Sequence, residues 1–442
     1  LDVAGLALAR ESREAAVPVA GVVRAWAGPP RAHLIGLAGA YPAATAALVT
    51  GTLAHALDFD DTHLPSILHP SAVLVPAGLA VAEACERGGR DLVVALAAGY
   101  EILVRLGMTA YDGDLRNSVF FEKGLHATSI CGTVAAAVVA ARLMDGDSQA
   151  IEAAIGIASS FGAGLLEANR TGGTVKRIHC GWAAHSGIAA AEFAAAGITG
   201  PPTVLEGRFG FFHGLCDGDF DAAILTDGLG DRWEVPGIVF KPYPANHFTH
   251  AGIDAAIALR AAGVEPDDIV RVDVGAPEPT LRTIAEPVEV KRRPPNGYAA
   301  RFSGPFTFAA ALLGGGGLGV YLDDFSDARA DDPAVLALAD RVHHHADEEC
   351  LAAYPGSLPG IVTVRLRSGE VIEHRVFHNR GGLERPLTRQ ELLLKFELNA
   401  RRGQAGTDES IAAVAEAIWH LERMGSVAEL GRLLSGQTDP DK

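Results

Sequence analysis

The segment from residue 55 to residue 70 concentrates side chains that can transfer protons or bind charged groups. In chain order it contains His55, Asp58, Asp60, Asp61, Thr62, His63, His69 and Pro70. Charged groups are costly to bury without partners, so such a cluster is either solvated or held together as a network. Imidazoles titrate near neutral pH and serve as general acids and bases. The cluster therefore predicts the corner of an active site.

A helix that continues into this cluster is the arrangement that we expect. On such a helix Asp58 and Thr62 are one turn apart on the same face, and His55 lies one turn before Asp58. Pro65 then ends the helix, and Pro70 starts the next helix at its first turn. Because unpaired backbone groups at helix ends favour anions, this corner is suited to an anionic ligand.

Three further stretches place cations and imidazoles beside apolar helices. They are Lys123–Gly132 with His126, Val175–His185 with Lys176, Arg177 and His179, and Phe240–His250 with Lys241. Thr128 is the expected N-cap of the helix that follows His126. Any single histidine here could instead cap a helix or satisfy the core, and Lys176-Arg177 could be a solvated pair. Their recurrence beside Gly and Pro turns favours a shared site, because catalytic side chains are commonly carried on loops.

A metal centre is the main alternative for the His/Asp cluster. The sequence has no HExxH motif and no EF-hand loop. His343-His344-His345 with nearby acids looks metal-like, but neighbouring side chains on a strand or helix point in different directions. The run Gly314–Gly319 has no strand before it, so a dinucleotide site is not favoured. We therefore expect no metal site.

The composition limits the class of partner and the location. A formal net charge of −17 over 442 residues argues against nucleic acid or an anionic membrane as partner. Five cysteines without a CxxC pair and the lack of a signal segment predict a cytoplasmic protein with reduced thiols. The apolar runs near 91–108 and 129–143 are expected as buried helices. Because the chain begins at Leu1 without Met, inside an apolar segment, we expect that residues precede it.

Hydrophobic periodicity predicts a mainly α fold with a mixed segment inserted into it. Helices are expected over Ala43–Asp58, Ser71–Glu86, Asp91–Met108, Thr128–Met144, Ser148–Phe161 and Trp182–Ala196, and again from Leu387. Strands are expected over Ile269–Val274, Ile361–Leu366 and Val371–Val376. We therefore predict a large all-helical domain from both chain ends, residues 1–240 and 381–442, with a smaller α+β domain over residues 241–380.

Together these stretches resemble the 2-methylcitrate dehydratase family, often called MmgE/PrpD, which includes cis-aconitate decarboxylase and iminodisuccinate epimerase. The matching segments are His55–Thr62 with His69-Pro70-Ser71, Gly124–Gly132, Lys176–Gly187, Gly197–Pro201, Phe240–His250, and Arg385–Leu387 with Lys395-Phe396. The resemblance covers nearly the whole chain. It implies that the α+β domain is a lid, that the protein is a homodimer, and that no metal or organic cofactor is used.

The resemblance also implies which residues form the site. By position it implies Asp58, Thr62, His69, His126 and Lys176 as the catalytic set and Lys241 as a substrate-binding residue. To the substrate-binding set we add Arg177, for its charge beside Lys176, and Tyr298. The family often has a Tyr where this chain has Phe306, and Tyr298 is the nearby hydroxyl that could replace it. The cations would hold substrate carboxylates, His126 or His69 would be the base, Asp58 would orient an imidazole, and Thr62 would place a hydroxyl.

Family members act on small di- and tricarboxylates whose reacting carbon lies next to a carboxylate. We therefore expect a lyase, a dehydratase that removes a proton next to a carboxylate of a 2-methylcitrate-like hydroxy acid. An isomerase or epimerase, or a decarboxylase on a related dicarboxylate, would need little more than a different partner group. A member that binds a carboxylate without turnover is a further alternative, which Phe306 supports. Nothing in the sequence selects one polycarboxylate.

Overall fold

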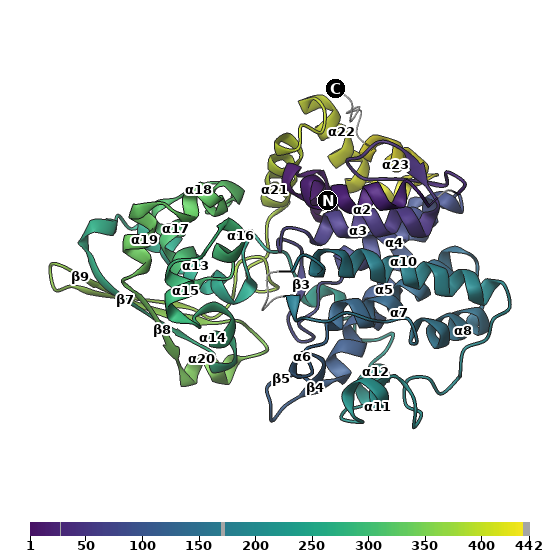
Figure 1. The fold of residues 1–442 in the computed structure, drawn as a ribbon, viewed down its shortest axis with the longest axis horizontal. Coiled ribbons are helices and arrows are strands. Elements are labelled where there is room, and N and C mark those ends of the chain that lie inside the picture. Colours follow the sequence, from purple (N-terminus) through teal and green to yellow (C-terminus); the bar gives the residue numbers. More distant parts are fainter. Residues whose placement is uncertain (27, 169–172, 436–442) are drawn as a thin grey trace. The chain divides into compact units, whose positions relative to one another are not determined.

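The computed structural model describes residues 1–26, 28–168 and 173–435, and the chain divides into two units (Figure 1). The helical unit contains Leu1–Ile238 and Leu392–Lys442, and the mixed unit contains Val239–Glu391. Helices dominate the described residues, which confirms the prediction of a mainly α fold. Residues 436–442 of the predicted C-terminal part lie outside the described residues.

The helices of the helical unit come from both ends of the chain. They are α1 (Asp2–Leu8), α2 (Arg10–Val23), α3 (Ala43–His55), α4 (Ser71–Ala84), α5 (Gly89–Thr109), α6 (Val119–Glu122), α7 (Ala127–Leu143), α8 (Ser148–Ala158), α10 (Lys176–Ala195), α11 (Phe211–Cys216), α12 (Ala223–Thr226), α21 (Arg389–Arg402, from Leu392 in this unit), α22 (Asp408–Trp419) and α23 (Ala428–Leu434). The short strands are β1 (Ala32–His33) and β2 (Ala40–Tyr41), β4 (Tyr111–Asp112) and β5 (Asn117–Ser118), and β3 (Thr62–His63).

The centre of the helical unit is a close crossing of helices. α10 packs against α7, α3 and α8, and α4 packs against α3 and α7 (Figure 1). A Cβ added at Gly51 of α3 would lie 2.6 Å from the Cα of Gly181 in α10. A Cβ at Gly181 would lie 2.1 Å from the carbonyl oxygen of Leu48. Glycine at both positions therefore lets two backbones touch, which sets the end of α3 relative to the start of α10.

The two long apolar runs form helices as predicted. Every residue of α7 except Arg142 is buried. In the part of the chain that the structure describes, α5 has the length and apolar composition of a membrane span, and 56% of its apolar window is buried. Within α5 the buried Arg105 pairs with Glu101 across one helical turn, at 3.2 Å, so two charges inside the apolar run satisfy each other.

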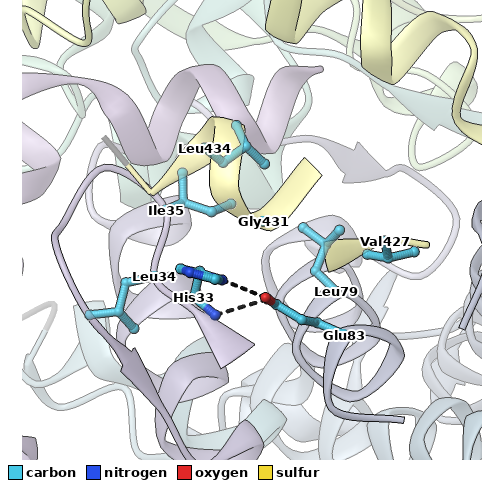
Figure 2. Close-up of a pocket in the computed structure, with 8 residues that line it drawn as sticks. All are labelled: His33, Leu34, Ile35, Leu79, Glu83, Val427, Gly431 and Leu434. Atoms are coloured by element: carbon cyan, nitrogen blue, oxygen red, sulfur yellow. Dashed lines mark hydrogen bonds and ion pairs between the residues drawn. The ribbon is translucent and has the colours of Figure 1, made fainter. Parts of the chain in front are cut away.

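A small pocket lies where β1, α4 and α23 meet (Figure 2). Its lining residues come from both the N-terminal and the C-terminal part of the helical unit. It is lined by His33, Leu34, Ile35, Leu79, Glu83, Val427, Gly431 and Leu434. The backbone amide of His33 donates to Glu83 Oε2 at 2.8 Å, and the His33 ring also pairs with this carboxylate. The amide of Gly36 donates to the carbonyl of Leu434 at 2.9 Å. These contacts attach α23 to the N-terminal part.

The end of α3 differs from the prediction in a way that matters for the site. α3 ends at His55, and Asp58 has a left-handed backbone with φ of +52°. Thr62 lies in β3. The prediction that Asp58 and Thr62 share a helix face, with the helix ending at Pro65, was wrong. Asp side chains bond to nearby backbone and tolerate the left-handed conformation, so the acidic run ends the helix early.

The start of α10 also differs from the prediction. The helix begins at Lys176 and not at Trp182, so Lys176, Arg177 and His179 lie in its first turn and a half. Lys and Arg are good helix formers, and the packing of Gly181 against α3 extends the helix through them. The segment that was expected as a loop is therefore a rigid part of a buried helix.

The mixed unit contains a four-stranded sheet in the order β10-β9-β7-β8. β7 (Ile269–Ala276) pairs in parallel with β8 (Val342–Ala346) and antiparallel with β9 (Gly360–Leu366), and β9 pairs antiparallel with β10 (Val371–Val376). The helices are α13 (His250–Ala261), α14 (Glu278–Ile284), α15 (Val288–Arg292), α16 (Gly297–Ala300), α17 (Gly304–Leu313), α18 (Asp327–Ala330), α19 (Pro333–Ala339) and α20 (Glu348–Ala353). The three predicted strands are present.

The glycine contact between α3 and α10 can be tested by adding one methyl group. We expect Gly51→Ala to lower the free energy of unfolding by about 1–3 kcal/mol, because the new Cβ overlaps the backbone of Gly181. Gly21→Ala is the matched control, because a Cβ at Gly21 in α2 has no neighbour within 4 Å. We expect Gly21→Ala to raise the free energy of unfolding by about 0.5–1 kcal/mol. Urea unfolding measures both, and an equal effect of the two substitutions would contradict the close crossing.

Candidate active site

The polar segment that follows α3 is buried. Asp60, Asp61 and His63 have no exposed surface, and Asp58 and Thr62 are at most 4% exposed. These groups are therefore a network inside the protein, the second of the two possibilities that the sequence left open. The Nδ1 atom of the His63 ring bonds Ser66 Oγ at 2.8 Å, and its Nε2 faces Gly237, so this imidazole turns toward residues 234–237.

His55, the last residue of α3, is bound to the carboxylate of Asp60. The distance from His55 Nδ1 to Asp60 Oδ2 is 2.7 Å, and both side chains are buried. Because a carboxylate accepts hydrogen bonds, the Nδ1 atom of His55 carries a hydrogen and donates it. Asp60 also lies 4.0 Å from the Nδ1 atom of His69. The carboxylate therefore faces two imidazoles at once.

Backbone contacts set the orientation and protonation of His69. Its ring Nδ1 is 2.7 Å from the carbonyl oxygen of Asp61, and a carbonyl can only accept, so Nδ1 carries the hydrogen. The Nε2 atom of neutral His69 is therefore the basic nitrogen. Thr62 Oγ1 is 3.4 Å from the same Nδ1, and the backbone amide of His69 donates to Thr128 Oγ1 at 3.2 Å. Thr128 is not the N-cap that was predicted: the N-cap of α7 is His126.

Four imidazoles form a continuous row in the helical unit, in the order His179, His126, His55 and His69. The distances between successive ring centroids are 5.0, 5.6 and 5.5 Å. The Nδ1 atoms of His126 and His179 are 3.0 Å apart, so one of the two donates a hydrogen bond to the other. We call these four residues the imidazole row. It joins the end of α3, the start of α7, the first turns of α10 and the segment before α4.

Burial holds two rings of the imidazole row, His126 and His179, in their neutral forms. Burial lowers the pKa of His126 well below its usual value, and the nearby His55 and Lys176 lower it further. Burial lowers the pKa of His179 to about 4, again with help from His55 and Lys176. At neutral pH both rings are therefore uncharged and able to accept a proton. An anionic ligand beside them would offset the repulsion between a protonated ring and Lys176.

Lys176 supplies positive charge beside the row. It is half-buried at the first residue of α10, where unpaired backbone amides and the helix dipole also favour an anion. Its positive charge contributes to lowering the pKa of both His126 and His179. Arg177 is the next residue and is also half-buried. The arrangement combines proton acceptors with a cation of the kind that pairs with carboxylates.

The structure thus brings Asp58, Thr62, His69, His126, Lys176 and Arg177 into one unit, and the other two predicted residues lie in the mixed unit. Lys241 is 1% exposed. Tyr298 lies on α16, where its ring contacts Phe302, with 5.5 Å between centroids, and the guanidinium of Arg301 lies over it. Phe306 is fully buried in the core of the mixed unit. The roles of these residues stay predictions.

No group of three or more His, Cys, Asp or Glu side chains is arranged to hold a metal ion within the described ranges. His343, His344 and His345 lie in β8, where successive side chains alternate between the faces of the sheet. His343 Nδ1 accepts a hydrogen bond from Arg292 at 2.8 Å. His344 therefore lies on the opposite face of the sheet from His343 and His345.

The sequence reasoning did not assign tasks to His55, Asp60 or His179, although it identified all three within polar motifs. His55 and Asp60 are five residues apart in the sequence. Because the sequence analysis expected one helix through both residues, it did not predict that their side chains would pair. It placed Lys395 in a matching motif but gave it no role, and this lysine is 2% exposed in α21. Its Nζ donates to the carbonyl of Phe59 at 2.8 Å and pairs with Asp2 at 2.6 Å.

Asp61 forms a second buried contact behind the site. Its carboxylate accepts from the backbone amide of Ser71 at 3.2 Å and from the Ser71 hydroxyl, which in turn contacts the hydroxyl of Tyr100. Burial raises the pKa of Asp61 to about 7, and the neighbouring Asp60 adds to the increase. Ser71 opposes it by hydrogen bonding. Asp61 therefore binds α4 to the segment after α3 at the start of that helix.

Comparison with known proteins finds matches over most of the chain. The family model of the MmgE/PrpD N-terminal domain matches residues 1–223, and that of the MmgE/PrpD C-terminal domain matches residues 243–421. A cis-aconitate decarboxylase-like protein of Aspergillus oryzae is 28% identical, over 91% of this chain and 85% of that protein. The cis-aconitate decarboxylase of Homo sapiens is 28% identical over 90% of this chain and 81% of that protein. The cis-aconitate decarboxylase of Aspergillus terreus is 25% identical over 88% of this chain and 81% of that protein.

The raised pKa of Asp61 predicts the sign of a pH effect on stability. Because its pKa is about 7 in the folded state and 3.8 ordinarily, the folded protein binds the additional proton between these values. The contribution of Asp61 is therefore fully present below about pH 4 and is lost as the pH rises to about 7. We expect the free energy of unfolding of Asp61→Asn, relative to that of the wild type, to increase by about 2 kcal/mol as the pH rises from about 5 to 7. Urea unfolding at several pH values measures this, and a constant difference would contradict it.

Proposed function

The chain belongs to the MmgE/PrpD family, and on this premise we propose that it is a cofactor-independent lyase for small di- or tricarboxylates. In the proposed reaction, a proton is removed from a carbon next to a carboxylate and water is lost, as from a 2-methylcitrate-like hydroxy acid. The observation that carries the proposal is the imidazole row itself, in which burial and the nearby charge of Lys176 lower the pKa of His126 and His179. A neutral base next to a cation suits the removal of a proton from an anionic substrate.

Each step of the proposal uses a contact in the helical unit. When His126 donates its Nδ1 hydrogen to His179, its Nε2 is the base that takes the substrate proton. Lys176 holds the carboxylate and stabilises the charge that develops on it, with Arg177 as a second cation. His69, whose Nδ1–H is bonded to the carbonyl of Asp61, receives at Nε2 the proton that was removed from the substrate and donates it to the departing hydroxyl, which leaves as water. Lys241 and Tyr298 remain proposed contacts of the substrate.

A decarboxylase is the second candidate, and the comparisons favour it. The relatives from Homo sapiens and Aspergillus terreus are named cis-aconitate decarboxylases, and both match this chain over most of its length. Proton transfer at a carbon next to a carboxylate is common to both reactions. The two candidates therefore differ in what leaves, carbon dioxide or water, and not in the residues that bind the substrate.

A screen in deuterated buffer with EDTA distinguishes these reactions. We expect exchange of a proton next to a carboxylate, with release of water or carbon dioxide, for at least one of citrate, 2-methylcitrate and cis-aconitate. An iminodisuccinate-like diacid tests for an epimerase, whose product keeps every substrate atom. Proton NMR follows all of these outcomes. Binding with thermal stabilisation but no exchange on any compound would support a non-catalytic protein.

His126→Gln tests the proposed base. We expect it to reduce turnover at least about 100-fold, because the amide cannot accept the substrate proton. His420→Gln is the matched control, because that imidazole is exposed at the end of α22, where it pairs with Glu416. It should leave turnover and the melting temperature unchanged. A folded His126→Gln protein with normal turnover would exclude His126 as the base.

Lys176→Ala tests the proposed carboxylate contact. We expect it to raise KM and to lower kcat together, because Lys176 would bind the substrate and also stabilise the developing charge. Lys123→Ala is the control, because Lys123 pairs with the exposed Asp217 at 2.8 Å. Steady-state kinetics on the substrate found in the screen measure both variants. An unchanged kcat with Lys176→Ala would limit this lysine to binding.

A further inference from the structure

The proposed reaction leaves one imidazole in the middle of the row without a task. His55 is 4% exposed, and its Nδ1 donates to the carboxylate of Asp60 at 2.7 Å. Its Nε2 is buried and has no hydrogen-bond partner among the residues that the structure describes. A buried polar atom without a partner is unfavourable, and in native proteins it calls for an explanation. A use in proton transfer is one such explanation.

The position of His55 suits this use. Its ring stacks on that of His126, with 5.6 Å between centroids and 30° between planes, and lies 5.5 Å from the ring of His69 on the other side. Proton transfer between neighbouring rings at such separations takes place through a direct hydrogen bond or through a bridging water molecule. His55 thus lies between the proposed base and the proposed acid. The carboxylate at its Nδ1 would stabilise the imidazolium that forms when Nε2 takes a proton, as in hydrolase triads.

We propose that His55, held by Asp60, is a proton-relay residue that carries a proton from His126 to His69. The inference rests on the proposed function. After His126 Nε2 takes the substrate proton, a proton passes through water to His55 Nε2 and then to His69 Nε2. His69 donates it to the departing hydroxyl, which leaves as water, and all three rings return to their neutral forms. Asp60 stays ionised throughout, and no electrons are gained or lost.

The relay predicts that two parts of the reaction can be separated. In deuterated buffer, His55→Gln should still exchange the proton next to the carboxylate, because His126 and His179 are intact. Release of water should fall at least about 100-fold, because the proton no longer reaches His69. Asp60→Asn should show the same pattern, because an amide does not hold the Nδ1–H form of His55 as a carboxylate does. His126→Gln should lose both exchange and release.

His63→Gln is the matched control for the loss of a buried imidazole. His63 is fully buried, its Nε2 likewise has no hydrogen-bond partner among the described residues, and its ring faces Gly237. We expect this variant to exchange and release at wild-type rates. Melting temperatures of all variants show whether each one folds. A merely structural role of His55 would reduce exchange and release together, whereas the relay reduces release alone.

The outcomes separate the two proposals. A folded His55→Gln protein that releases water at the wild-type rate, or that loses exchange as well, overturns the relay. A wild-type protein that neither exchanges nor releases with any candidate acid overturns the proposed function. If His55→Gln does not fold, nitrogen-15 NMR of the labelled wild-type histidines decides. The relay requires His55 as the Nδ1–H tautomer at rest, and the Nε2–H tautomer would overturn it.

Discussion

A carboxylate that is removed from water must find hydrogen-bond donors, and Asp60, with no exposed surface, finds one at the ring Nδ1 of His55. This bond crosses the point where α3 ends, so it determines how the chain leaves the helix. The left-handed backbone of Asp58 and the strand position of Thr62 are parts of the same turn. The geometry of the whole polar segment therefore depends on the bond between Asp60 and His55.

Residues far away in the sequence hold that segment in place. Lys395 of α21 donates to the carbonyl of Phe59, lies 3.9 Å from the centre of the Phe59 ring and pairs with Asp2 of α1. A buried ammonium needs several such contacts, and these attach α21 to the N-terminal part of the chain. The pocket of Figure 2 attaches α23 to β1 and α4 in a similar way. Helices from the C-terminal part of the chain thus pack against the N-terminal part, and one of them, α21, contacts the polar segment directly.

The electrostatics of the site follow from burial more than from charge pairs. The low pKa of His126 and His179 has desolvation as its largest cause, and the raised pKa of Asp61 has the same cause. Burial thus favours the neutral form of bases and acids alike. A protein of net charge −17 can therefore still place the cation of Lys176 beside uncharged imidazoles. An anionic substrate would meet neutral proton acceptors beside one cation.

The amino-acid sequence by itself determined the mainly α fold, the three strands near residues 269, 361 and 371, and the set of residues that could do chemistry. These depend on local periodicity and residue type, which a sequence displays directly. Only the tertiary structure decided that α3 ends at His55, that Thr128 holds His69, and that His179, His126, His55 and His69 form a row. These features arise from contacts between residues up to 71 positions apart and from burial, which local periodicity does not encode.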